Sequence, residues 1–133
     1  MHNMLPADGE VELLTRLRRD LHRIPELDTK LPKTISYIET ELGAVREHLA
    51  ARFGEESCRI FSPCKSALCI FFDRKSEHAT AVRTDMDALP VTERSDVEFA
   101  SQHEGCMHAC GHDGHMSMAV SYTHLRAHET GRN

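Results

Sequence analysis

The sequence lacks several features that would place it in common functional classes. It has no tryptophan and only 5% aromatic residues. No apolar run approaches the ~20 residues of a membrane-spanning helix, so no membrane segment is expected. No Cys-x-x-Cys pair occurs, which argues against a thioredoxin-like redox motif and against the common zinc fingers. The first residues also lack the cationic and then apolar pattern of a secretory signal.

Cysteine usage and charge narrow the compartment and the partners. Five cysteines at irregular spacing favour reduced thiols and a cytoplasmic protein over a disulfide framework. The 16 basic and 21 acidic residues give a net charge of −5 without a basic stripe, so no nucleic-acid partner is expected. A chain of 133 residues, 40% hydrophobic and 28% charged, is typical of one globular domain.

Apolar periodicity predicts two helices and then short strands. In residues 10–24 and 33–52 the apolar positions recur every three or four residues, which is typical of helices with one buried face. Residues 58–61, 67–72 and 79–83 are rich in strand formers, and a hairpin is expected between the last two. Helices followed by strands predict an α/β fold. Most arginines of the first helix lie off its apolar face and are expected to be solvated: Arg16, Arg18, Arg19 and Arg23.

Two carboxylates follow the third predicted strand. Asp85 and Asp87 alternate along an extended segment, so their side chains are expected to point the same way. Two carboxylates that project together repel each other unless a cation or a shared proton lies between them. The pattern fits a metal site, but the spacing alone favours a solvated strand end with turn residues before Pro90.

The histidines and cysteines are concentrated in residues 105–118, GCMHACGHDGHMSM. Thiolate, imidazole and carboxylate are the ligands that zinc and similar ions take. Gly111 allows the backbone to bring Cys110 and His112 to one ion, and Asp113 can accept the second ring N–H of a ligand histidine. The cluster favours a metal site, with buried thiols and exposed histidines as the alternative. The remaining cysteines lack partners at ligand spacing and are expected to be buried structural thiols: Cys58, Cys64 and Cys69.

Three segments resemble one enzyme family. RRDLHRIPEL (18–27), RTDMDALPVTE (83–93) and GCMHACGHDGH (105–115) follow the order found in the metal-dependent N-acyl-amino-acid amidohydrolases. This group of aminoacylase- and carboxypeptidase-type metallopeptidases includes hippurate hydrolase and the plant auxin-conjugate hydrolases. The resemblance implies an α/β catalytic domain with a mixed sheet flanked by helices, of which residues 1–119 supply an incomplete N-terminal part.

The resemblance also implies roles for particular residues. Cys110 matches a cysteine that ligates, and can bridge, two divalent ions, and His112 matches the first histidine ligand. Asp87 matches an aspartate near the metals that orients rather than ligates, whereas His108 and His115 are not carried over as ligands. The implied reaction is hydrolysis of the amide bond of a small N-acyl amino acid by a metal-activated water. The implied cofactors are one or two Mn or Zn ions, and the full-length form is one that can form a homodimer.

The chain departs from this family after residue 115. No Glu-Glu pair follows, so the catalytic glutamate is missing, as are two further histidine ligands. Residues 120–133, VSYTHLRAHETGRN, resemble translated sequencing-adapter sequence. They are expected to form a non-native, weakly structured tail whose His124 and His128 are not ligands. The sequence therefore predicts a truncated amidohydrolase that is inactive alone. The alternative is a small stand-alone metal-binding protein that uses the 105–115 cluster.

Overall fold

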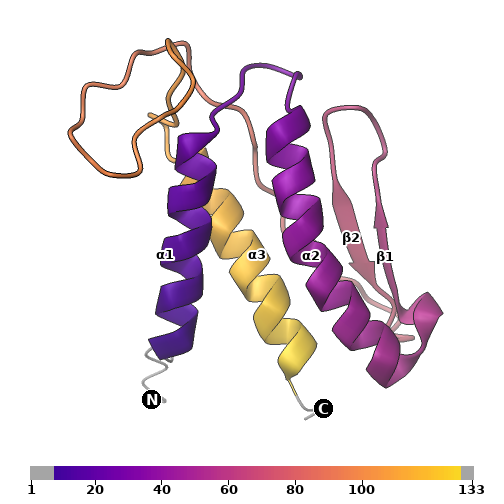
Figure 1. Ribbon diagram of the computed structural model, residues 1–133. Coiled ribbons are helices and arrows are strands. Elements are labelled where there is room, and N and C mark those ends of the chain that lie inside the picture. The colour runs from indigo at the N-terminus through magenta and orange to yellow at the C-terminus, as the bar shows by residue number, and fades with distance from the viewer. Residues whose placement is uncertain (1–7, 130–133) are drawn as a thin grey trace.

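The computed structural model describes residues 8–129, which form three helices and one short hairpin (Figure 1). Helix α1 spans Asp8–Arg23, α2 spans Pro32–Phe53 and α3 spans His112–His128. In Figure 1, α3 lies between α1 and α2, and it packs against both. None of these helices combines the length and the apolar character that crossing a bilayer requires.

The first two helices occupy the predicted ranges because their apolar stripes are buried against α3. Pro32 begins α2, where its missing N–H costs nothing. Gly54, with φ of 96°, ends α2 and donates its N–H to the carbonyl oxygen of Ala50 at 2.9 Å. The central cluster takes two residues from each helix: Leu17 and Leu21, Ile38 and Leu42, Met116 and Val120.

The hairpin differs from the predicted one. After the 3₁₀ turn η1, Glu55–Ser57, strand β1 (Cys58–Phe61) pairs antiparallel with β2 (Cys69–Phe72). The predicted strand at 79–83 is wrong, since these residues are irregular and Val82 is 60% exposed. A strand needs a neighbour for its backbone hydrogen bonds, and residues 8–129 place none beside this segment. The α/β prediction is confirmed, with the sheet limited to one antiparallel pair in the described chain.

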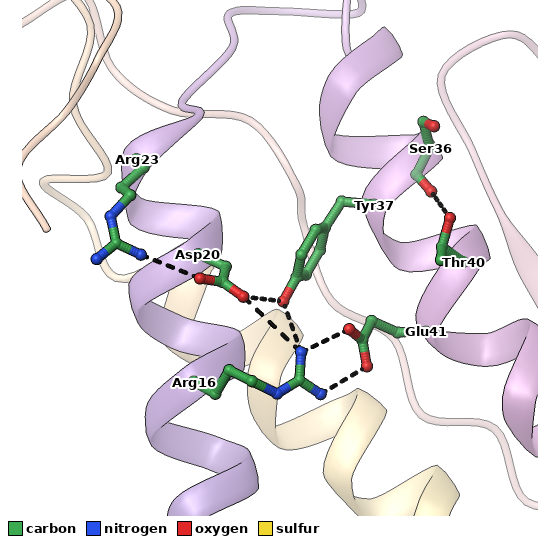
Figure 2. Close-up of polar contacts among 7 residues, drawn as sticks. All are labelled: Arg16, Asp20, Arg23, Ser36, Tyr37, Thr40 and Glu41. Carbon is green, nitrogen blue, oxygen red and sulfur yellow. Dashed lines mark hydrogen bonds and ion pairs between the residues drawn. The ribbon is translucent and has the colours of Figure 1, made fainter.

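The arginines of α1 were predicted to be solvated, but three of the four bind acidic groups: Arg16, Arg18 and Arg23. Arg16 donates two hydrogen bonds to the Glu41 carboxylate of α2, at 2.6 and 2.9 Å (Figure 2). The same close-up shows the Tyr37 hydroxyl donating to Asp20 at 2.7 Å, and Arg23 donating to the other Asp20 oxygen. Hydrogen bonding to Arg16 lowers the pKa of Glu41. These contacts fix the relative positions of α1 and α2.

The segment predicted to be a weakly structured tail is helical up to His128, which corrects that prediction. Val120, Ser121 and Ala127 of α3 are buried, and Ala127 packs with Val45 in a second apolar cluster. The helix runs without a break across the predicted boundary at 119/120. The foreign origin of residues 120–133 stays a prediction, and residues 1–7 and 130–133 lie outside the described range.

Candidate metal centre

An isolated pair of backbone hydrogen bonds brings the two chemically distinctive segments together. Leu89 and Met107 exchange N–H···O=C bonds of 3.0 Å in each direction. Leu89 follows the aspartate pair, and Met107 lies at the start of the Cys/His cluster. The long irregular segment between β2 and α3 thus folds back so that the aspartates face the beginning of α3.

His112, the first residue of α3, lies at the meeting point of these segments. Its Nδ1 is 2.7 Å from the backbone carbonyl oxygen of Asp87. Because a carbonyl only accepts, Nδ1 carries the proton, and in the neutral ring the lone pair is then on Nε2. The Asp87 carboxylate lies 3.2 Å from Nδ1, and the Asp85 carboxylate lies 3.9 Å from Nε2. The two aspartates therefore converge on one imidazole, although no strand positions them.

The backbone beside His112 depends on a glycine. Gly111 precedes α3 with φ of 91° and ψ of 13°, in the left-handed region that L side chains rarely adopt. Its carbonyl oxygen accepts the N–H groups of Gly114 and His115 at 3.0 and 3.1 Å. The turn places Cys110 before the helix with an exposed thiol, so Cys110 and His112 flank a sharp change of chain direction.

The sequence predicted that Asp113 accepts a hydrogen bond from a ligand histidine. In the structure Asp113 instead contacts a histidine of α1. Its Oδ2 lies 2.7 Å from Nδ1 of His22, and Nε2 of His22 lies 3.0 Å from Glu93 Oε1. The Arg18 guanidinium also contacts Asp113, at 3.1 Å. The sequence analysis did not single out His22 or Glu93. Both lie inside the motifs quoted above, and that position in a motif is the signal by which they could have been found.

Two further histidines of the cluster occupy contrasting environments. His108 is buried, and neither ring nitrogen has a hydrogen-bond partner among residues 8–129. Burial lowers the pKa of His108, and the nearby Asp113 carboxylate opposes that shift. His115 is exposed, with its ring centroid 5.9 Å from that of His112.

The remaining cysteines follow the prediction in part. Cys58 is buried at the start of β1, and burial raises the pKa of its thiol. Cys64 is exposed, contrary to the prediction, because it lies in the connection between the strands rather than in one of them. Cys69 is half-buried in β2.

The types of side chain near His112 suit a divalent ion, but too few of them are placed to hold one. Thiolate, an imidazole nitrogen with a free lone pair and carboxylates are all accepted by zinc-like ions. Among residues 8–129, however, no three His, Cys, Asp or Glu side chains are placed to hold one ion. Such ions normally take four or more ligands.

Comparison with known proteins places this geometry in context. The sequence pattern of peptidase family M20/M25/M40 matches residues 81–131, the segment that carries the aspartates and the Cys/His cluster. A hydrolase of uncharacterised function from Staphylococcus epidermidis is 39% identical over 114 residues, which is 86% of this chain and 27% of the relative. An N-acetyldiaminopimelate deacetylase from Leuconostoc citreum is 38% identical over 86% of this chain and 28% of the deacetylase.

A solved structure agrees with these sequence matches. A dinuclear metal-binding peptidase of the M20 family from Bacillus subtilis superposes with a TM-score of 0.74 at 31% identity, over 91% of this chain and 32% of that protein. The chain spans about a quarter of the length of the curated relatives that it matches. Residues 81–131 thus carry the sequence pattern of peptidase family M20/M25/M40, and the fold of the chain is similar to that of a solved member of this family.

Proposed function

We propose that the chain carries part of the metal centre of an enzyme that hydrolyses the amide bond of N-acyl amino acids. The observation that carries this proposal is the hydrogen bond from His112 Nδ1–H to the Asp87 carbonyl oxygen, 2.7 Å long. That bond leaves Nε2 of the neutral ring as a lone-pair donor, and the exposed Cys110 thiol belongs to the residue two positions earlier in the chain. The match to a family with a dinuclear metal-binding member supports the same centre.

In this proposal Cys110 and His112 hold a divalent ion, Mn or Zn, with a second ion in the complete enzyme. When bound, such an ion lowers the pKa of water and polarises an amide carbonyl. Asp87 fixes the ring of His112 through its carbonyl oxygen, so the imidazole does not need to be ordered when the ion arrives. The Asp85 and Asp87 carboxylates add negative charge around His112, which favours a cation there.

The substrate class follows from the motifs and from the named relative. The motifs resemble enzymes that act on hippurate-like N-acyl amino acids, and the relative from Leuconostoc citreum is named as a deacetylase of N-acetyldiaminopimelate. Both descriptions share an acyl group on the nitrogen of an amino acid. We therefore propose this class, with N-acetyl and N-benzoyl amino acids as the first two substrates to compare.

A chimaeric enzyme tests the proposal. Residues 8–119 replace the matching segment of the Leuconostoc citreum deacetylase, and hydrolysis is measured with and without chelator and after addition of Mn or Zn. We expect chelator-sensitive hydrolysis that Cys110→Ala and His112→Ala each reduce by about 100-fold or more. Cys64→Ala, which removes another exposed thiol, should leave the rate unchanged. A folded chimaera without activity, or full activity in both ligand variants, contradicts the proposal.

Calorimetric titration of the chain itself separates the proposal from a metal-storage role. With donors in the described residues too few for one ion, the chain alone should bind Mn or Zn weakly. Submicromolar binding of a single ion would instead favour a stand-alone metal-binding protein.

A further inference from the structure

We propose that His22 is a positioning residue that holds the two donor segments of the candidate centre against each other. This role of His22 rests on the proposed function, because the two segments carry Asp87 and His112. The contacts that support it lie outside the donor set. They join α1 to the irregular segment and to the start of α3, whose adjacent positions are visible in Figure 1.

His22 bridges two carboxylates that belong to different segments. Its side chain is 2% exposed, and those of Asp113 and Glu93 are 2% and 5% exposed. Asp113 directly follows His112, and Glu93 lies six residues after Asp87. One buried imidazole thus spans the distance between the segment that presents the aspartates and the helix that presents His112.

Each carboxylate is fixed to the backbone of its own segment. Oδ1 of Asp113 accepts the N–H of Gly114 at 2.9 Å in the first turn of α3. Oε2 of Glu93 accepts the N–H of Ser101 at 2.6 Å, and its Oε1 also accepts from the Ser95 hydroxyl. The carboxylates therefore transmit the position of the His22 ring to the backbone on both sides.

The charges explain why a histidine is suited to this position. An imidazole carries one nitrogen on each side of its ring, so His22 can face both carboxylates at once, and a ring N–H donates where an ionised carboxylate only accepts. Arg18, whose side chain is 39% exposed, lies 3.1 Å from the buried Asp113 carboxylate and supplies a positive charge beside it. The ring of Phe99 packs edge-on against His22 at 5.6 Å and limits its rotation.

The consequence is measurable at His112 without any metal. If His22 sets the distance between the segments, its loss lets the Asp87 carbonyl move away from His112 Nδ1, and the bond that selects the Nδ1–H tautomer weakens. The test is ¹⁵N NMR of the His112 ring in the metal-free chain at about pH 8, where an ordinary histidine is neutral. We expect mainly Nδ1–H in the wild type and a fraction below half in His22→Ala.

Two conservative variants separate the arms of the bridge. The amide nitrogen of His22→Asn replaces Nδ1 and can still reach Asp113, whereas that of His22→Gln replaces Nε2 and can still reach Glu93. Because each variant keeps one link, both should give tautomer fractions between the wild type and His22→Ala. If His22→Ala does not fold, these two variants decide the question.

A matched control distinguishes positioning from general stability. Leu17→Ala empties part of the central cluster on the same helix, so it should lower stability while leaving the His112 tautomer unchanged. An unchanged Nδ1–H fraction in all folded His22 variants would overturn the inference, as would an equal shift in Leu17→Ala. An inactive chimaera would contradict the proposed function alone, since the tautomer is read without metal or substrate.

Discussion

The conformation of Gly111 leads to a prediction in which one chemical change has opposite effects at two positions. Alanine at Gly111 must adopt φ of 91°, whereas Gly43, inside α2, is outside the positive-φ region. At neither position would the new methyl group meet another atom within 4 Å. Steric contacts are thus excluded, and the effect of each substitution comes from the backbone alone.

The magnitudes follow from that difference. An L side chain in the left-handed region costs about 1–2 kcal/mol, and the lower entropy of the unfolded alanine chain offsets about 0.4–1 kcal/mol. Gly111→Ala should therefore lower the free energy of unfolding by about 1 kcal/mol. Gly43→Ala should raise it by about 0.5–1 kcal/mol, because alanine is the better helix former.

Urea unfolding followed by far-ultraviolet circular dichroism measures both values. With an m-value of ~2 kcal/mol/M, the two variants should unfold with midpoints about 1 M apart. The wild type should lie between them. If Gly111→Ala equals or exceeds the wild type in stability, the left-handed turn between Cys110 and His112 does not require glycine.

Three further predictions concern stability. Leu21→Ala should cost about 3 kcal/mol, since Leu21 is fully buried; Leu125→Ala, at a 39% exposed site, should change the free energy by less than about 0.5 kcal/mol in the same urea assay. Burial opposes ionisation of Glu93, but its hydrogen bonds hold its pKa at about 2, below the ordinary 4.5. Its contribution is therefore complete above pH 4.5 and is lost as the pH falls towards 2, so Glu93→Gln should flatten the acid limb of a stability–pH curve. Arg16→Gln should lower the free energy of unfolding by less than about 1 kcal/mol, because half of the Arg16 side chain is exposed. The same urea assay measures this change.

The helices could be predicted from the sequence because their signals are local. The stripe that contains Leu17 and Leu21, and the one that contains Ile38 and Leu42, each repeat within a single segment, and any apolar partner suffices to bury them. Pro32 and Gly54 mark the ends of α2 by restrictions on their own backbones. No knowledge of the rest of the fold is needed for these elements.

The strands were harder to predict because pairing is a relation between segments. Residues 79–83 were predicted to form a strand, as were 58–61 and 67–72, yet among residues 8–129 only 58–61 and 69–72 pair. The polar connection 62–68 is long enough to return the chain, and the register places Cys58 opposite Phe72. Propensity identifies which segments can form strands, but it does not choose between two neighbours that compete for the same edge.

The same difference between local signals and relations between distant segments applies to the candidate site. Cys110, His112 and Asp87 could be proposed from residue type and motif, because ligand chemistry is visible in the sequence. The bond from His112 to a backbone carbonyl could not, since a carbonyl oxygen carries no residue identity. The link between His22 and Asp113 joins residues 91 positions apart, and no short-range spacing rule could pair them.

These contacts show how groups that do not ligate can prepare a metal donor. Two donors are too few to hold a divalent ion, but the orientation of His112 is fixed by groups that are not donors: the Asp87 carbonyl on one side of the ring and the His22 bridge behind Asp113. The entropic cost of ordering that imidazole is then incurred when the segment folds, and not when an ion binds. Any additional ligands contributed by the complete enzyme would act on a donor already held in its binding tautomer, so that its affinity for metal would depend on residues that never touch the ion.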